Sequence, residues 1–88
     1  PRKFEINNAY PNPFNPSTSI NLHMPVMGYV NVAVYDLNGR VVETLFSGMQ
    51  SEGNYNIIWN ASGQSSGMYL IRAETEQQKA VQKVLLLK

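Results

Sequence analysis

Side chains that carry catalysis are sparse in this 88-residue chain and lie far apart in the sequence. The one histidine, His23, falls on the polar side of an alternating stretch, between Asn21 and Pro25. A catalytic histidine needs an acid or a nucleophile beside it, and the sequence places none there. We therefore interpret His23 as a solvent-facing residue of a strand and predict no catalytic residue.

The six acidic residues give no better sign of enzyme chemistry. No two of them have a spacing that indicates the paired carboxylates of a glycoside hydrolase. Asp36 and Asn38 offer two oxygen ligands, but a calcium site needs several, and both residues are typical of turns. The stretch from Gly63 to Gly67 lacks the lysine of a phosphate-binding loop. The sequence thus predicts a non-enzyme with no cofactor and no metal site.

Aromatic residues leave a binding function open. Trp59 and the five tyrosines could form a face on which sugar rings stack, so a carbohydrate-binding module is one alternative. Alternation along the chain, however, places Trp59, Tyr55 and Ile57 together, which favours a core role. Asn60-Ala61-Ser62 matches the acceptor pattern for N-glycosylation, which is a weak three-residue signal. A purely structural spacer is a further alternative.

Composition restricts the class of protein. Hydrophobic residues make up 43% of the chain and charged residues 15%, and the net charge is +1 with the basic residues scattered. This balance suits one small globular domain spanning residues 1–88 and predicts no nucleic-acid partner. The chain has no cysteine and therefore no disulfide. The longest apolar run, Val84 to Leu87, is far shorter than the roughly 20 residues of a membrane span, so no membrane insertion is predicted.

The elements that position these residues are arranged around the proline-rich stretch from Tyr10 to Pro16. Its three prolines fix φ and remove backbone donors, so the stretch is neither a helix nor a central strand. We expect a rigid extended connector that carries the chain from one sheet of a β-sandwich to the other. The rings of Tyr10 and Phe14 are expected to close one end of the core.

The rest of the chain alternates apolar and polar residues between turn signals, and Asn38-Gly39 predicts a tight hairpin. The last segment also fits a helical stripe, but a sheet needs a closing strand there. The expected strands are Lys3–Asn7, Ser17–Met24, Tyr29–Asp36, Val41–Phe46, Asn54–Asn60, Met68–Thr75 and Lys79–Lys88. The expected inward-facing residues are Ile20, Leu22, Val30, Val32, Val34, Ile57, Trp59, Tyr69 and Ile71. The predicted fold is all-β: an immunoglobulin-like antiparallel β-sandwich of about seven strands.

Several separated motifs follow one another along the chain. They are Tyr10-Pro11-Asn12-Pro13-Phe14-Asn15-Pro16 with Ser17-Thr18-Ser19-Ile20, then Val34-Tyr35-Asp36-Leu37-Asn38-Gly39-Arg40-Val41-Val42, Trp59-Asn60-Ala61, Ser66-Gly67-Met68-Tyr69, and the lysine-bearing end with Leu85-Leu86-Leu87-Lys88. This ordered set, from Ala9 to Lys88, resembles the type A C-terminal sorting domain of the type IX secretion system. Immunoglobulin-like parts of flagellar hook-capping proteins share some of these features.

The resemblance implies an address label at the end of a protein secreted by Bacteroidetes and their relatives. A cargo domain would precede it in the same chain, with residues 1–8 as first strand and junction. The label would pass through the periplasm and bind outer-membrane components of the secretion machinery. A sortase-like peptidase commonly removes such a label, and the cargo ends at the cell surface or secreted. We expect the cleavage point within Pro1 to Asn8 or just upstream.

The resemblance also implies which residues carry the signal. They are Pro11, Asn12, Pro13, Gly67, Tyr69, Lys79, Lys83, Leu85, Leu86, Leu87 and Lys88. The prolines, Gly67 and Tyr69 are expected to act through the fold. A terminal edge strand offers unpaired backbone groups to which a partner can add a strand, and Lys83 and Lys88 would oppose self-association there. An exposed edge also permits dimers.

Overall fold

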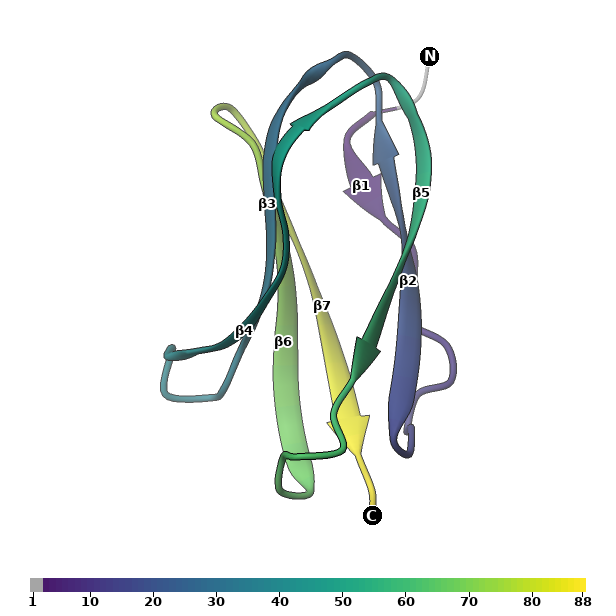
Figure 1. Ribbon diagram of the computed structural model, residues 1–88, viewed down its shortest axis with the longest axis vertical. Coiled ribbons are helices and arrows are strands. Elements are labelled where there is room, and N and C mark those ends of the chain that lie inside the picture. The colour runs from purple at the N-terminus through teal and green to yellow at the C-terminus, as the bar shows by residue number, and fades with distance from the viewer. Residues whose placement is uncertain (1–2) are drawn as a thin grey trace.

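Two antiparallel sheets lie face to face in the computed structural model, which describes residues 3–88 (Figure 1). The strands are β1 (Glu5–Ile6), β2 (Ser17–Met24), β3 (Gly28–Tyr35), β4 (Val41–Gln50), β5 (Gly53–Asn60), β6 (Gly67–Glu74) and β7 (Lys79–Leu86). One sheet has the order β1-β2-β5 and the other β4-β3-β6-β7. No helix occurs among the described residues. The predicted all-β sandwich of about seven strands is confirmed, and its arrangement is compatible with an immunoglobulin-like description.

The last segment forms a strand rather than a helix. β7 pairs with β6 along its whole length, from Lys79 opposite Glu74 to Leu86 opposite Gly67. Pairing with β6 buries Val84 and Leu86 on the inner face and leaves Lys79 and Lys83 exposed. The helical stripe in this sequence was therefore a misleading signal, because the alternate residues of a short apolar run satisfy both periods.

Two strand boundaries differ from the sequence-based prediction. β4 continues to Gln50, whereas Ser47 onward was predicted as a loop. The continuation pairs with β3, with Ser47 opposite Asn31 and Met49 opposite Tyr29, so the length of β3 sets the length of β4. β1 is only two residues long, shorter than predicted. Residues 1 and 2, where part of the expected junction and cleavage region falls, lie outside the described residues.

The core lies between the sheets and follows the predicted alternation. Eight of the nine predicted inward-facing residues are buried, and Ile57 is half-buried at the margin of the core. Phe14, Trp59 and Tyr69 form an aromatic cluster at one end. The Trp59 ring centroid lies 5.5 Å from that of Phe14 and 5.2 Å from that of Tyr69. Trp59 also donates its indole N–H to Glu43 Oε1 of the opposite sheet at 3.1 Å, so its one polar atom is satisfied.

The proline-rich segment joins β1 and β2, which belong to the same sheet, so the prediction that it carries the chain from one sheet to the other was wrong. It leaves that sheet only to contact β7 of the other sheet and then returns. Its start pairs with β2, where Tyr10 lies opposite Ser19, and its middle forms a parallel bridge between Phe14 and Leu86 of β7. Phe14 is buried and closes the core, but Tyr10 is 79% exposed, so the prediction for the Tyr10 ring was wrong. Thr18 and Ile20 on β2 are buried, so Ser19 between them faces outward. Tyr10 lies directly opposite Ser19 and therefore also points outward.

The β3–β4 hairpin is closed by the residues that predicted it. Gly39 has φ +86°, in the left-handed region that glycine occupies without strain. The Asp36 carboxylate accepts hydrogen bonds from the backbone N–H groups of Asn38 and Arg40, at 2.9 and 3.0 Å. The Arg40 bond is the main reason that the pKa of Asp36 lies below its ordinary value. Asp36 is thus a turn residue rather than a metal ligand.

Candidate functional site at the covered end of β7

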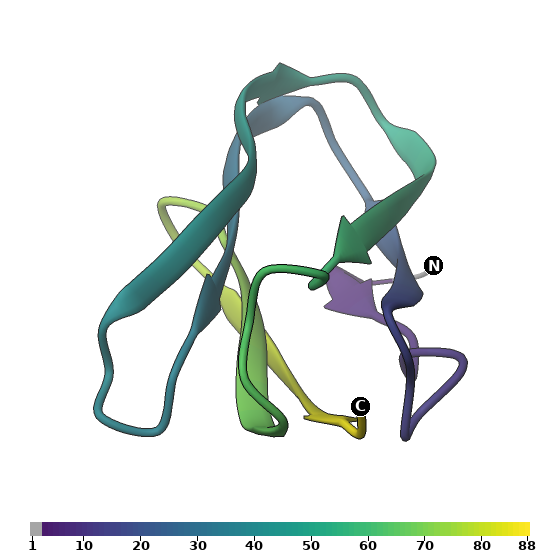
Figure 2. The ribbon, with the colours of Figure 1, turned by 60° about the horizontal axis from the view of Figure 1, so that its bottom comes forward.

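The proline-rich segment is hydrogen-bonded along the outer edge of β7. The Asn12 side chain makes two of these bonds: its Nδ2 donates to Lys83 O at 3.0 Å, and its Oδ1 accepts from Leu85 N at 2.9 Å. The Phe14 backbone makes two more, donating to Leu85 O at 2.9 Å and accepting from Leu87 N at 3.0 Å. The side-chain amide of Asn12 therefore substitutes for a peptide group in a short added strand. The proline-rich segment thus lies at the same end of the sandwich as the C-terminus, in the lower part of Figure 2.

This contact corrects the expectation that the last strand is an open edge. Backbone groups at Lys83, Leu85 and Leu87 that point away from β6 are bonded to the proline-rich segment. Alternate residues of a strand point the same way, so Val81 and Lys79 also direct their N–H and C=O groups outward. Within residues 3–88, no hydrogen bond reaches those outward groups. The first half of β7 is therefore the part of this edge whose outward groups make no hydrogen bond, although β1 contacts β7.

Thr18 of β2 is hydrogen-bonded to the proline-rich segment. It was not among the residues predicted from the sequence. Its hydroxyl donates to Pro11 O at 2.7 Å, and the side chain is 2% exposed. A buried hydroxyl needs such a partner, because an unpaired one costs free energy. The signal was present in the sequence: Thr18 shares the inward face of β2 with Ile20, where an apolar residue is expected.

The C-terminal residue is fixed to the loop between β5 and β6. Lys88 lies beyond the end of β7 and pairs with no strand. Its backbone N–H donates to Ser66 Oγ at 3.0 Å, and its Nζ donates to Ser62 O at 2.7 Å. Asn60 caps the same loop, since its Oδ1 accepts from the backbone N–H and the hydroxyl of Ser62. The Lys88 ammonium therefore already has a partner within the domain.

Gly67 and Tyr69 occupy structural positions at the start of β6. Gly67 has φ +151°, which side-chain-bearing residues rarely adopt, and it opens β6. The Tyr69 ring packs edge-on against Trp59, and its hydroxyl donates to Ser65 O at 2.6 Å. A tyrosine at the start of a strand that bonds back to the preceding turn is the tyrosine corner of immunoglobulin-like sandwiches. Tyr69 is 7% exposed and offers little surface to a partner.

The remaining predicted site residues divide by exposure. Leu86 is fully buried and Leu85 is half-buried, so these two stabilise the domain rather than face a partner. Leu87 is 52% exposed, and Pro11 and Pro13 are exposed beside it in the proline-rich segment. Ten of the eleven predicted residues, all except Lys79, therefore lie at this end of the sandwich or pack beneath it. Leu86 is one of the buried residues.

Lys79 lies apart from the rest of the predicted site. It begins β7 beside the β6–β7 turn, while Lys83 lies four residues further along the same outer face. Four residues of extended strand span about 13 Å, so one compact ligand does not contact both ammonium groups. The predicted site residues therefore fall into two regions: the end of β7 that the proline-rich segment covers, and the first half of β7.

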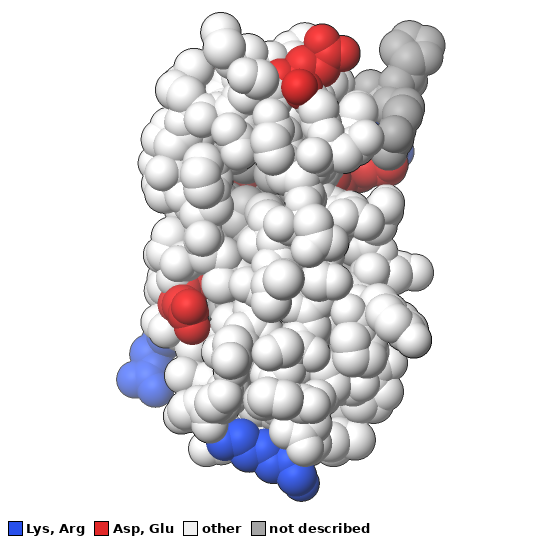
Figure 3. Space-filling view, turned by 45° about the vertical axis from the view of Figure 1, so that its right-hand side comes forward, with Lys and Arg blue, Asp and Glu red and all other residues white. Residues whose placement is uncertain are grey.

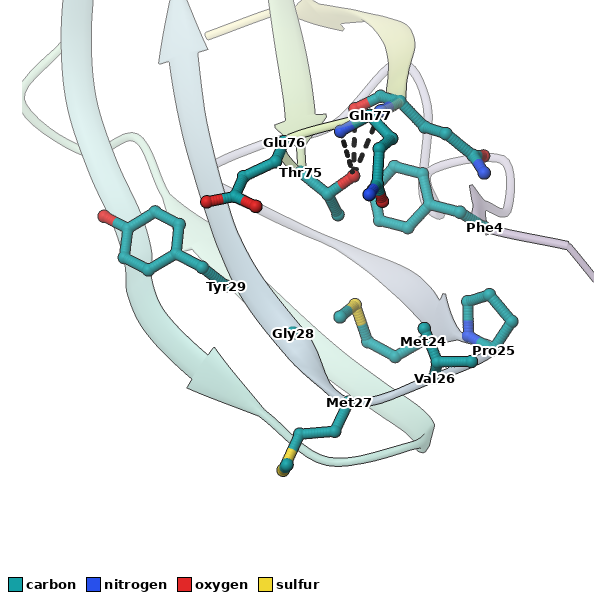
Figure 4. A pocket seen from close by; sticks show the side chains of 11 residues that line it. Phe4, Met24, Pro25, Val26, Met27, Gly28, Tyr29, Thr75, Glu76 and Gln77 are labelled. Carbon is teal, nitrogen blue, oxygen red and sulfur yellow. Dashed lines mark hydrogen bonds between the residues drawn. The ribbon is translucent and has the colours of Figure 1, made fainter.

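Other parts of the described chain offer no catalytic arrangement. A hollow of about 260 Å³ lies at the opposite end, between the β2–β3 and β6–β7 turns (Figure 4). Its walls include Phe4 and Met24, and Glu76 is its one carboxylate; the Thr75 hydroxyl is used by the turn itself, accepting from Gln77 N and Gln78 N. Residues 3–88 contain no group of three or more metal-ligating side chains. No helix in that range is suited to crossing a membrane.

His23 and Trp59 have structural surroundings. His23 Nδ1 lies 2.8 Å from Asn54 Oδ1 on the outer face of β2 and β5, and Glu5 of β1 lies opposite His23 in the strand register. Trp59 is 1% exposed, so it forms no platform for a sugar ring. The carbohydrate-binding alternative built on Trp59 is therefore wrong.

These contacts define the class of module: a small all-β sandwich whose last strand is partly covered by a proline-rich segment from the N-terminal part of the same chain. Over residues 8–87 the chain matches the family described as "Secretion system C-terminal sorting domain", and it belongs to that family. The chain thus carries a C-terminal sorting signal of type IX secretion, which is a non-catalytic kind of module. Comparisons with curated proteins and with solved structures gave no match.

Proposed function

We propose that outer-membrane components of the type IX machinery recognise this domain as a folded unit. The cargo would be a preceding domain of the same chain, delivered through the periplasm to the cell surface or the medium. A sortase-like peptidase would then remove the label near its N-terminal junction. The family assignment supports the pathway, and the geometry supports recognition of a folded label rather than of a bare tail.

The observation that carries this proposal is the contact between Asn12 and β7. Residues from both ends of the chain that the family resemblance singles out lie within hydrogen-bonding distance of each other. An unfolded tail would present Lys83 to Lys88 without Pro11, Asn12 and Pro13 beside them. A machine that reads this end therefore reads the folded state as well as the sequence.

Truncation of the tail tests the proposal. We expect deletion of Lys83 to Lys88 to block export of a reporter fused to the domain. Because the deletion also removes buried Val84 and Leu86, a second variant, Leu87→Asp with Lys88→Glu, should be made alongside it. This pair changes exposed side chains only, and we expect it to lower export while the domain still unfolds cooperatively. Unaltered export of both variants would contradict recognition at this end.

A further inference from the structure

Beyond the covered end, the outer face of β6 and β7 carries a shallow hollow, here called the β7 hollow. It has a volume of about 190 Å³ and is lined by Tyr35, Gly39, Leu70, Arg72 and Val81. Val81 lies opposite Arg72 on the neighbouring strand, and Lys83 lies opposite Leu70. Residues directly opposite share one face, so Lys83 stands at the rim of the hollow.

The walls of the β7 hollow are rigid and largely apolar. The Arg72 guanidinium lies 4.3 Å from the centroid of the Tyr35 ring, and its Nη2 donates to the Tyr35 hydroxyl at 2.7 Å. Arg72 Nε also lies 3.5 Å from Glu74 Oε1. These contacts fix Arg72 as a wall and leave Val81, 52% exposed, as the apolar side chain that solvent reaches.

Charge on this face is unbalanced. β6 and β7 carry Arg72, Glu74, Lys79 and Lys83, and the one carboxylate among these four is paired with Arg72. Neither Lys79 nor Lys83 has a side-chain hydrogen bond or ion pair with another described residue. Two exposed ammonium groups therefore flank Val81 on one strand. Glu74 lies opposite Lys79, but the three basic side chains of β6 and β7 still outnumber this one carboxylate.

The other sheet lacks this character. β2 and β5 contain no Asp, Glu, Lys or Arg, and the middle of the face turned to the viewer in Figure 3 carries none of these residues. An acidic partner would thus find complementary charge over β7 and none over β2 and β5. The first half of β7 is also where the outward backbone groups make no hydrogen bond, so the charged face adjoins the unpaired part of the edge.

We propose that the β7 hollow binds an extended acidic segment of the secretion machinery, in which two carboxylates four residues apart flank an apolar residue. Alternate residues of an extended segment share one face, so the carboxylates meet Lys79 and Lys83 while the apolar residue covers Val81 and Leu70. This inference rests on the proposed sorting function and names the chemistry of its partner.

Charge reversal in the whole domain tests the inference in a host with the pathway. We expect the double variant Lys79→Glu/Lys83→Glu to lower export of a fused reporter at least about tenfold, because like charges across an interface are strongly unfavourable. The charge-preserving pair Lys79→Arg/Lys83→Arg should export normally, and so should Lys3→Glu, a reversal outside this face. The urea midpoint of each variant shows that it is folded.

The possible outcomes separate the two proposals. If the unaltered domain does not direct export, the sorting function fails. If it does and Lys79→Glu/Lys83→Glu is exported equally well, the acidic partner is wrong and the sorting function stands.

A peptide gives an independent measurement of the same site. The probe is Thr-Glu-Thr-Val-Thr-Glu-Thr, blocked at both ends, added to the ¹⁵N-labelled domain. We expect amide shifts centred on Val81 and Leu70 that disappear in the Lys79→Glu/Lys83→Glu variant. A control peptide with both glutamates replaced by glutamine should cause none. Absence of shifts at millimolar peptide, or shifts centred on β2 and β5, would overturn the proposal.

Discussion

Asn12 Oδ1 accepts a hydrogen bond from Leu85 N at 2.9 Å, although the two residues are 73 positions apart. The same amide donates to Lys83 O, so one side chain pairs with two consecutive outward groups of β7. Through this contact the proline-rich segment acts as a short extra strand on a sheet edge. An edge covered in this way is protected from pairing with other chains.

Replacing Asn12 should weaken this cover. We expect Asn12→Ala to lower the free energy of unfolding by about 1–2 kcal/mol, because two exposed hydrogen bonds are lost. Urea denaturation measures the change. Asn15→Ala is the matched control, since Asn15 is exposed in the same segment and makes no hydrogen bond with a described residue. Equal stability of the two variants would show that the Asn12 contacts contribute nothing.

Loss of the cover should also expose the second half of β7. We expect Asn12→Ala to self-associate more than Asn15→Ala at high concentration, because the backbone groups of Leu85 become available for strand pairing. Sedimentation velocity at several concentrations detects this. If the sedimentation coefficient of Asn12→Ala depends on concentration no more than that of Asn15→Ala, the Phe14 contacts alone are enough to prevent strand pairing.

Tyr69 offers a test of the corner between β5 and β6. We expect Tyr69→Phe to lower the free energy of unfolding by about 1 kcal/mol, since the ring still packs on Trp59 but the bond to Ser65 O is lost. Tyr10→Phe is the control, because Tyr10 is 79% exposed and its hydroxyl has no partner among the described residues. A Tyr69→Phe domain as stable as the control would rule out the corner as a stabilising contact.

Most of the strands could be predicted from the sequence, because they have a period of two between turn residues, whereas the bounds of β1 and β4 could not. Ile20, Leu22 and the three valines of β3 are buried as their alternation requires. The β3–β4 hairpin was readable for a different reason: Asn38-Gly39 specifies a turn by local geometry alone.

The covered end could be predicted only in part. The resemblance named Asn12 and Leu85, but their contact depends on the path by which the proline-rich segment reaches β7 of the other sheet, which no local pattern encodes. The Tyr10 ring was misplaced for the same reason, since its direction is set by register against Ser19. The β7 hollow combines side chains from β3, β6 and β7, so its lining appears only after the strand order is known.

Asp36 provides a pH test of the hairpin. Its pKa is lowered in the fold, chiefly by the bond from Arg40 N, so the carboxylate's contribution to stability is present above the ordinary aspartate value of 3.8 and is lost as the pH falls through the folded value. We expect NMR of the carboxyl carbon to give a titration midpoint below 3.8 in the folded domain. In the urea-unfolded chain, the midpoint should return to the ordinary value. A folded midpoint at or above 3.8 would contradict the turn geometry.

The most direct measurement of the central claim is the destination of a reporter protein that carries residues 1–88 at its C-terminus, in a host with type IX secretion. We predict that the reporter reaches the cell surface or the medium, and that the same fusion stays in the periplasm when the pathway is disabled. A folded fusion that remains in the periplasm of the competent host would contradict the claim that this domain is a sufficient sorting signal.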